Sequence, residues 1–445
     1  MLFIYSQGKI VSHRPFENSR SSHARAKKHM PLGVADSYRF WEDETVFIKS
    51  MSGGTITDVD DNTYMDFRLC YGPIILGYRD KRVDKAVIDC IQNVGSMVGF
   101  SLDIESQVCE LIKSMCPNIE KLRFANSGTE AVLGAIRTAR GYTKRERLIV
   151  IEGGFHGLFD EMMWKSDVEG WNKQKENAPP IIPFGGGLTA ASRALVELIP
   201  LNDYDQLEEK LKDKSIAAVI IEPIMGNCGS IMATTEYMKA LRKLCTQTGT
   251  ALIVDEVKTG FRVAKGGVQE LYGVHADLTT YAKAMGNGYP VAAFGGKSEL
   301  MDCIHFGEGG VTHGGTYTAN LVGMAAAKQT LSIIKDTDAL QTINHVGSEI
   351  QKILKLKLNK YGIPCTFSGP DSMFGIHFGD CVPQNYRDWR DTKPERYVRF
   401  AKHLIDLGVM VEPDSREPWF ICEAHKDLDL NHLAALIDTA LAQTE

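Results

Sequence analysis

The chain has 445 residues, of which 44% are hydrophobic and 24% are charged, and its formal net charge is −6. This length exceeds one ordinary hydrophobic core, so we expect more than one domain. The acidic balance provides no long-range attraction to nucleic acid. No apolar run approaches the roughly 18 residues of a membrane span, and no basic segment precedes the apolar start of the chain, so we expect neither a membrane partner nor a signal peptide.

The cysteine and histidine patterns indicate neither disulfides nor a bound metal. The ten cysteines are scattered singly, without a CxxC pair, and the twelve histidines show no HExxH spacing. Single thiols of this kind are typical of a reducing compartment. We therefore predict a cytoplasmic protein without a metal site.

The first part of the chain combines a polar helix with a β-hairpin. Residues up to Arg39 are polar and basic, which favours a helix followed by a loop. Residues 55–67 (TITDVDDNTYMDF) alternate in polarity on both sides of an Asp-Asp-Asn turn. That pattern predicts two antiparallel strands.

Short apolar runs then alternate with amphipathic segments as far as about residue 330. The runs at 148–153, 217–224 and 251–257 are apolar on both faces, and helices are expected at 130–141 and 236–248. Strands that are apolar on both faces belong to a parallel sheet covered by helices on both sides.

Two segments depart from this alternation. Residues 167–190 are rich in Gly and Pro, which predicts a long loop that covers a site or moves. Beyond residue 330 the pattern changes to helix, strand and helix, which indicates a smaller C-terminal α+β domain.

The carboxyl ends of the predicted strands carry acids, at the edge where open α/β sheets bind ligands. These acids are Glu152, Glu222, Asp255 and Glu256. A single lysine, Lys283, lies between a Thr-rich run and a Gly-rich turn. An acid that holds a protonated ring nitrogen and a lysine that forms a Schiff base are what pyridoxal 5'-phosphate (PLP) requires of a protein. Taken singly, each residue is better explained as a strand end or an exposed charge.

The turn formed by Ser127, Gly128 and Thr129 leads from a strand into a helix. Free backbone N–H groups at such a helix start suit a phosphate. Ser127 and Glu130 also fit an ordinary capping box, which is the better explanation of this turn alone.

Two other turns offer groups for a flat, phosphorylated cofactor. Phe155 follows the run at 148–153, where its ring would stack on the cofactor with His156 behind it; a core Phe and a loop His explain the pair better in isolation. Thr316, in the Gly-Thr-rich segment GGTYTAN, offers a hydroxyl donor, a weak signal by itself.

Together the motifs resemble the class III (ω-) aminotransferases of PLP fold type I, and among them most closely the glutamate-1-semialdehyde aminomutase branch. The matching segments include SGTEA (127–131), EGGFHG (152–157), DEVKTGFR (255–262), DLTTYAKAMGNGYP (277–290) and GGTYTAN (314–320). The resemblance covers residues ~30 to ~425 in the family's order.

The resemblance implies an α/β fold with two domains. The large domain, residues 71–330, would have a mainly parallel central sheet flanked by helices and would bind PLP. The small α+β domain would be built from the N-terminal segment, residues 1–70, and the C-terminal segment, residues 331–445.

The resemblance also implies a role for each motif residue that faces PLP. Lys283 would form the internal aldimine and carry protons, and Asp255 would pair with the pyridine nitrogen. Phe155 and Val257 would contact the two faces of the ring, with His156 behind Phe155.

The resemblance also implies roles for the remaining cofactor-binding residues. Gly128 and Thr129, in the turn that begins at Ser127, would bind the phosphate, and Glu222 and Asn227 would lie near the ring's O3' and the substrate. Thr316 would reach the phosphate of a neighbouring subunit. The resemblance therefore implies a homodimer with shared active sites.

Two arginines are candidates for the substrate carboxylate, because a guanidinium pairs with a carboxylate in bidentate geometry. Arg39 stands where the aminomutase branch keeps such an arginine, and Arg416 stands where some β-amino-acid aminotransferases do. Either would serve equally as a surface ion pair. Tyr71, with Tyr38 and Trp41, would supply aromatic walls.

Two departures from the aminomutase pattern bear on the reaction. The lysine is followed by GNGYP (286–290) instead of GGGLP, and the motif at 155–157 is FHG instead of YHG. They favour an intermolecular aminotransferase that moves an amino group from an α- or β-amino acid or an amine to an oxo acceptor. The alternative is an intramolecular aminomutase acting on glutamate-1-semialdehyde or a relative, and amino-acid epimerisation is a third outcome in this class. A catalytically inactive binding protein is disfavoured by the pairing of Lys283 with Asp255.

Overall fold

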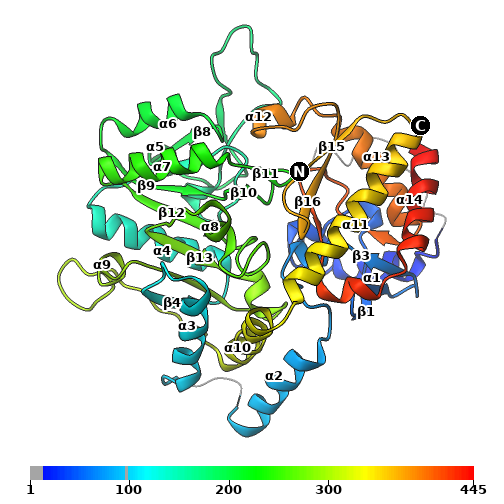
Figure 1. The fold of residues 1–445 in the computed structure, drawn as a ribbon, viewed down its shortest axis with the longest axis horizontal. Helices are drawn as coiled ribbons and strands as arrows, with labels where there is room; N and C mark the ends of the chain where they lie inside the picture. Colours follow the sequence, from blue (N-terminus) through cyan, green and yellow to red (C-terminus); the bar gives the residue numbers. More distant parts are fainter. Residues whose placement is uncertain (1–13, 96–98, 445) are drawn as a thin grey trace.

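The computed structural model describes residues 14–95 and 99–444 of the chain. Within these residues, seven strands form the central sheet of the larger part of the molecule (Figure 1). In spatial order they are β4 (Lys121–Ala125), β14 (Ala292–Gly296), β13 (Leu278–Tyr281), β12 (Ala251–Glu256), β9 (Ile216–Ile221), β5 (Arg147–Ile151) and β8 (Val196–Ile199). All neighbours from β13 to β8 are parallel, and β14 runs antiparallel to both β13 and β4. The predicted mainly parallel sheet is confirmed.

Helices cover both faces of this sheet because alternate residues of its strands point to opposite sides. The helices in contact with it include α4 (Gly128–Thr143), α6 (Tyr204–Leu211) and α7 (Thr235–Thr248). In β9, Val219 and Ile221 belong to a buried cluster with α6 and α7, whereas Ala218 and Ile220 belong to a cluster with α4. Strands buried on both faces explain the continuous apolar runs in the sequence. The two predicted helices, at 130–141 and 236–248, are confirmed with extensions of one to two residues.

A smaller sheet joins the two ends of the chain. Its strands are β1 (Ile48–Ser52), β2 (Thr55–Asp58), β3 (Thr63–Asp66) and β17 (Val409–Met410). β2 and β3 pair antiparallel, as predicted, and the Asp58 carboxylate fixes their turn by accepting from the backbone N–H groups of Asp60 and Asn62 at 2.9 and 2.8 Å. β3 pairs in parallel with β17. A small α+β domain therefore contains both N- and C-terminal segments, although its boundaries at residues 70 and 330 stay a prediction.

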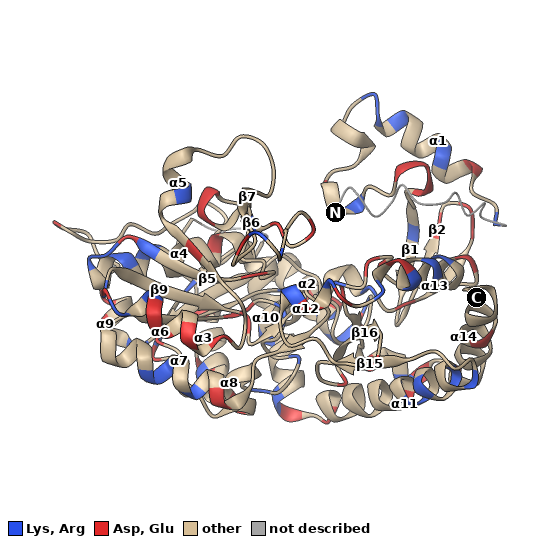
Figure 2. Ribbon diagram, turned by 90° about the horizontal axis from the view of Figure 1, so that it is seen from above, with Lys and Arg blue, Asp and Glu red and all other residues tan. Residues whose placement is uncertain are grey.

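The rest of the smaller part consists of helices around a three-stranded sheet. The strands are β15 (Cys365–Ser368), β16 (Met373–Phe378) and β18 (Trp419–Phe420), and the helices include α1 (Glu17–Ala26), α11 (Ala339–Lys360), α13 (Pro394–Asp406) and α14 (Leu430–Thr444). α10 (Leu321–Asp336) leads into this part from the large sheet. In Figure 2, α1 lies above β1 and β2, and Ser19 of α1 donates its backbone N–H to Asp60 in the hairpin turn at 2.8 Å. The helix–strand–helix pattern predicted beyond residue 330 is confirmed.

The segment 167–190 is less irregular than its composition predicts. β7 (Ile181–Pro183) lies inside it and pairs antiparallel with β6 (Trp164–Ser166). The prediction of a continuous loop is therefore wrong for residues 181–183, where two isoleucines form a short strand directly after Pro-Pro. Arg390 connects the first part of segment 167–190 to the C-terminal part of the chain, because it donates to the carbonyl oxygens of Val168 and Trp171.

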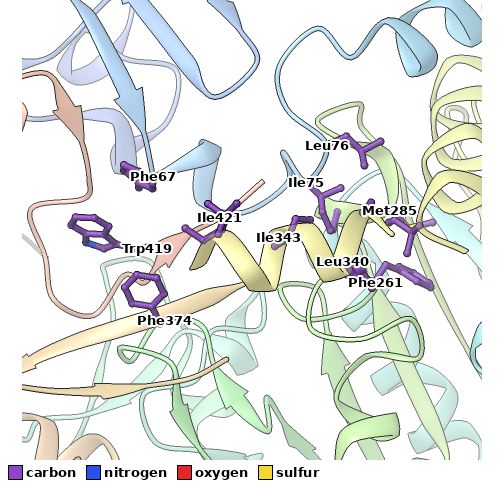
Figure 3. Close-up of a cluster of buried hydrophobic side chains, with 14 of the residues drawn as sticks. Phe67, Ile75, Leu76, Phe261, Met285, Leu340, Ile343, Phe374, Trp419 and Ile421 are labelled. Atoms are coloured by element: carbon purple, nitrogen blue, oxygen red, sulfur yellow. The ribbon is translucent and has the colours of Figure 1, made fainter. Parts of the chain in front are cut away.

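One buried cluster runs from the small domain to the strand ends of the large sheet. Figure 3 shows Phe67, Phe374 and Trp419 at one end of this cluster and Phe261 and Met285 at the other. The rings of Phe67 and Trp419 stack with centroids 5.1 Å apart. Because Met285 lies two residues after Lys283, this packing also fixes the segment that carries the lysine.

Arg262 is buried at the junction of the two domains. It is fully buried and donates to backbone carbonyl oxygens at 2.7–3.2 Å. The acceptors are Gly72, Ile74, Ser372 and Ile421. Burial lowers the pKa of the guanidinium to about 10. A cation held by carbonyl oxygens from three separate segments fastens those segments to the turn that follows β12.

Basic and acidic residues both occur along the chain in both parts of the molecule (Figure 2). Among residues 14–95 and 99–444, no helix is long and apolar enough to cross a membrane. All ten cysteines are free thiols.

We predict that Arg262→Met lowers the free energy of unfolding by about 3 kcal/mol or more, because buried carbonyl groups without a donor cost about 1–3 kcal/mol each. Chemical denaturation followed by tryptophan fluorescence measures the change. The control is Arg82→Met, which breaks exposed ion pairs with Asp80 and Glu423 and is expected to cost about 0–1 kcal/mol. Equal denaturation midpoints for the two variants would show that the Arg262 cluster does not hold the domains together.

Candidate active site

Lys283 lies at the carboxyl edge of the central sheet. β12 and β13 pair in parallel with Glu256 opposite Tyr281, and Lys283 follows two residues later as the first residue of the 3₁₀ turn η6 (Lys283–Gly286). Its φ of 45° is in the left-handed region, which a residue with a side chain rarely adopts. Such strain persists only where the surroundings fix it, here through the buried side chains of Ala284 and Met285.

Asp255 is buried at the end of β12, and its carboxylate has three hydrogen-bonding neighbours. His156 Nδ1 lies 2.8 Å from Oδ2, the Thr280 hydroxyl donates to Oδ1 at 2.8 Å, and the Val257 backbone N–H donates to Oδ1 at 3.0 Å. Burying an ionised carboxylate costs several kcal/mol unless it is paired. These contacts keep Asp255 in place as an anion.

His156 provides the cationic partner of Asp255. Burial of the imidazole lowers its pKa, but the hydrogen bond to Asp255 and the charge of that carboxylate outweigh burial, so the pKa of His156 is raised. Its Nε2 atom is also buried and has no hydrogen-bond partner among the described residues. His156 therefore holds the Asp255 carboxylate in place through Nδ1.

Glu222 follows β9 and anchors two loops of the site. Its Oε1 accepts from the Phe155 backbone N–H at 3.0 Å, and its Oε2 accepts from the Gly226 backbone N–H at 3.2 Å. Burial raises the pKa of Glu222. The Phe155 ring in turn meets the edge of the Tyr38 ring, with centroids 6.0 Å apart. Phe155 is thus fixed through both its backbone and its ring.

A second buried lysine, Lys258, lies in the same region and was not predicted from the sequence. Its Nζ donates to the Gly226 carbonyl oxygen at 2.7 Å and to Glu417 Oε2 at 2.9 Å. Asn227 donates its side-chain N–H to the other oxygen of Glu417, and Asn227 Oδ1 is buried without a partner among the described residues. Lys258 stands inside the motif DEVKTGFR, but no local pattern distinguishes it from an exposed lysine. No local sequence pattern singles out Glu417 either.

The surroundings of Lys283 favour its neutral amine. The pKa of Lys283 is lowered to about 7, first by burial and next by the positive charge of Lys258, while Glu417, Glu222 and Asp255 oppose the shift. A lysine must lose its proton to act as a nucleophile or base. Lys283 therefore loses its proton more readily than an ordinary lysine.

The start of α4 has one half of the predicted capping box. The Ser127 hydroxyl accepts from the Glu130 backbone N–H at 3.2 Å, whereas the Glu130 carboxylate accepts from the Asn126 backbone N–H at 2.7 Å and not from that of Ser127. Ser127 therefore caps the helix as predicted, but the reciprocal bond of a capping box is shifted by one residue. This cap leaves the first N–H groups of the helix available, so it does not compete with anion binding.

The same helix start lies against the other motif residues. A Cβ atom on Gly128 would be 3.0 Å from Val257 Cγ1, so glycine allows this close approach. The Thr129 hydroxyl accepts from the Leu158 backbone N–H at 3.3 Å, next to Phe155 and His156. The structure thus brings the phosphate-binding candidates beside the acid and the aromatic loop.

The two arginine candidates differ in their surroundings. Arg39 is exposed and makes no side-chain hydrogen bond or ion pair with any described residue. Arg416 donates to both carboxylate oxygens of Asp414, at 2.7 and 3.1 Å, and lies over the Trp389 ring at 5.4 Å. Its guanidinium is already occupied.

The aromatic candidates gather around an arginine that the sequence did not single out. Arg68 lies 4.2 Å from the Tyr71 ring and 5.1 Å from the Trp41 ring, and it is held by Glu412 Oε2 at 2.6 Å. The Tyr71 hydroxyl donates to the Tyr38 carbonyl oxygen at 2.6 Å. The predicted aromatic wall is therefore one connected group.

Thr316 is the one predicted cofactor residue that stands apart from these contacts in the described chain. It is exposed, in a segment that also exposes Phe306 and Tyr317. Residues 14–95 and 99–444 contain no group of three or more His, Cys, Asp or Glu that would bind a metal ion.

The donor set fits PLP. A neutral lysine, a buried paired carboxylate and a helix start with free N–H groups are the partners of an aldehyde, a pyridinium nitrogen and a phosphate. Asn227 Oδ1 and His156 Nε2 are buried at this place and have no hydrogen-bond partner among the described residues, as expected where a polar ligand binds.

Comparison with known proteins agrees with this geometry. A family model described as aminotransferase class-III matches residues 38–437. The chain is 36% identical over 409 residues to the glutamate-1-semialdehyde 2,1-aminomutase of Methanothrix thermoacetophila, covering 92% of each chain.

Solved structures share the fold over nearly the whole chain. An ω-transaminase from Sphaerobacter thermophilus superposes with a TM-score of 0.88 at 27% identity and 99% coverage of both chains. The PLP internal aldimine form of the FumI protein from a Sphingopyxis species superposes with a TM-score of 0.82 at 26% identity and 96% coverage of both. The chain is a PLP-dependent enzyme and belongs to the class III aminotransferase family.

Proposed function

We propose that this enzyme moves an amino group within one carboxylate-bearing molecule, as a 2,1-aminomutase of glutamate-1-semialdehyde or a close relative. The observation that carries the proposal is the similarity, over almost the full length of both chains, to proteins named glutamate-1-semialdehyde 2,1-aminomutase. This similarity supports the alternative drawn from the sequence more strongly than its main interpretation, the intermolecular aminotransferase.

The two arginines support the same choice. Within residues 14–95 and 99–444, the guanidinium of Arg39, the aminomutase-type candidate, makes no hydrogen bond or ion pair, whereas that of Arg416, the candidate shared with β-amino-acid aminotransferases, is paired with Asp414. An unpaired guanidinium binds a substrate carboxylate without first breaking an ion pair. We therefore assign the substrate carboxylate to Arg39.

The sequence departure at GNGYP has a structural explanation. Asn287 accepts from the backbone N–H groups of Ile75 and Leu76 at 3.0 and 2.9 Å and donates to the Gly77 carbonyl oxygen. The Tyr289 hydroxyl donates to an Asp84 carboxylate oxygen at 2.9 Å. Asn287 therefore holds the backbone at residues 75–77, and Tyr289 holds the helix that contains Asp84. Since both side chains have these structural contacts, the motif is weak support for a different reaction.

The roles of the chain's residues follow from their positions. PLP, when bound, supplies an electron sink for the charge left by a broken C–H bond. Asp255 would hold its ring nitrogen, Gly128 and Thr129 its phosphate, and Phe155 and Val257 its faces. Lys283 Nζ accepts a proton and returns it to the substrate.

An intermolecular aminotransferase is the second candidate. Phe155 replaces the tyrosine of the aminomutases at the ring-stacking position, and transaminases are among the solved structures with the same fold. No observation favours epimerisation.

The subunit arrangement and location belong to the same proposal. The exposed segment with Thr316, Phe306 and Tyr317 supports a homodimer in which Thr316 completes the partner's phosphate site. A cytoplasmic location stays a prediction.

We predict that Lys283→Ala abolishes both turnover and the visible absorption of lysine-bound cofactor. Asp255→Asn is expected to retain PLP but to lower kcat about 10²–10³-fold, like the loss of other buried electrostatic stabilisers. Lys297→Met is the control, because Lys297 follows the antiparallel strand β14 at the opposite edge of the sheet. Turnover by Lys283→Ala at the wild-type rate would refute the assignment.

The choice between the two reactions is tested by supplying one substrate at a time. With the PLP or pyridoxamine phosphate form and glutamate-1-semialdehyde alone, an aminomutase is expected to yield 5-aminolevulinate with no second product. An aminotransferase instead requires a donor such as alanine or glutamate and releases its keto acid. Mass spectrometry of the products distinguishes the two, and keto acid release without isomerisation would overturn the aminomutase proposal.

Arg39→Met is expected to raise KM for a carboxylate substrate by about 10- to 160-fold, since a hydrogen bond to a charged group contributes about 1.5–3 kcal/mol. Steady-state kinetics with substrate and with an analogue that lacks the carboxylate measures the effect, which should vanish for the analogue. Arg416→Met is the matched variant, and a larger KM effect there would move the carboxylate site to Arg416.

A further inference from the structure

Two lysines occupy equivalent places at the carboxyl edge of the sheet. β12 and β13 are parallel neighbours, with Glu256 opposite Tyr281 in their register. Lys258 lies two residues beyond Glu256, and Lys283 lies two residues beyond Tyr281. Both lysines therefore follow neighbouring parallel strands at the same edge of the sheet, where the repulsion between two ammonium groups favours the neutral amine of one of them.

The contacts of the two lysines differ. Lys258 donates to the Gly226 carbonyl oxygen and to Glu417, with side chains of Lys258 and Glu417 only 5% and 3% exposed. A Cβ atom on Gly226 would be 2.1 Å from Lys258 Cδ, so this glycine makes room for the lysine stem. For Lys283 no hydrogen bond or ion pair of its Nζ is found among the described residues.

We propose that Lys258 is a positioning residue for Lys283: its ammonium, anchored on Glu417 and Gly226, holds the Schiff-base lysine in the neutral form. This inference deepens the proposed function, because it rests on Lys283 being the reacting lysine. It holds for an aminomutase and for an aminotransferase alike, since both begin with the free amine.

The charges that face the two lysines act in opposite directions. Lys258 lowers the pKa of Lys283, and Glu417, Glu222 and Asp255 raise it. His156 partly offsets Asp255, because it is hydrogen-bonded to that carboxylate. Loss of the Lys258 charge removes the repulsion and leaves the three carboxylates, so the pKa of Lys283 must rise toward its ordinary value.

The test measures the pKa of Lys283 itself. Full-length enzyme freed of cofactor is labelled at a series of pH values with a trace amount of acetic anhydride, which reacts with neutral amines, and the label on Lys283 is quantified by peptide mass spectrometry. Lys258→Met is expected to raise the midpoint by about one pH unit, a roughly tenfold loss of neutral amine below the midpoint. In the holoenzyme, the pH midpoint of the visible band of lysine-bound cofactor should rise as well.

Lys258→Arg separates this charge effect from damage to the fold. It keeps a positive charge beside Glu417 and Gly226, so the Lys283 midpoint is expected to stay close to that of the unchanged enzyme. Lys297→Met, at the opposite edge of the sheet, should leave the midpoint unchanged. An unchanged midpoint in Lys258→Met, or an equal rise in Lys258→Met and Lys258→Arg, would overturn the proposal.

The labelling result is independent of turnover. If Lys283→Ala remained active, the proposed function would fail although the charge coupling between the two lysines could still be measured. If Lys283→Ala were inactive and the midpoint of Lys258→Met did not move, the role of Lys258 alone would be refuted.

Discussion

The burial of Asp255 at the end of a parallel strand is the constraint on which the rest of the site depends. A carboxylate in that position has lost its water and must be compensated within the protein. His156 supplies charge, while Thr280 and the Val257 N–H supply hydrogen bonds. Each partner comes from a different element: the loop after β5, the neighbouring strand β13 and the turn after β12. The position of one carboxylate therefore fixes three segments that surround the cofactor site.

The same constraint explains why other charges at this edge occur in opposed pairs. Lys258 faces Glu417 at 2.9 Å, and Glu152, at the end of β5, holds Arg387 in a bidentate pair at 2.7 Å. Both pairs join the large sheet to the C-terminal part of the chain. The same ion pairs therefore join the two parts of the chain and compensate buried charge. Lys283 differs, because its pKa of about 7 lets it lose its charge instead.

The sequence predicts the groups whose chemistry is written in local pattern. The hairpin at 55–67 alternates in polarity and was recognisable from local pattern, whereas Asp255 and Lys283 became recognisable only together with the other motifs of the family. Lys258 and Glu417 are 159 residues apart, and Arg262 is held by backbone carbonyl oxygens up to 190 residues away. Every residue has a backbone carbonyl group, so residue types do not show which carbonyl groups accept from Arg262. The sequence alone also does not distinguish a buried lysine from an exposed one. These long-range contacts could not be predicted from periodicity or motif.

Similar limits apply to using motif departures as markers of the reaction. Asn287 differs from the aminomutase pattern close to Lys283 in the chain, yet its side chain is fully engaged with the backbone at residues 75–77. Proximity in sequence therefore did not place it in the substrate's path. A residue informs on substrate choice only if it has unsatisfied hydrogen-bonding capacity that faces the substrate. Asn287 fails the first part of that criterion, whereas Arg39 meets it, because its guanidinium makes no hydrogen bond or ion pair with the described residues.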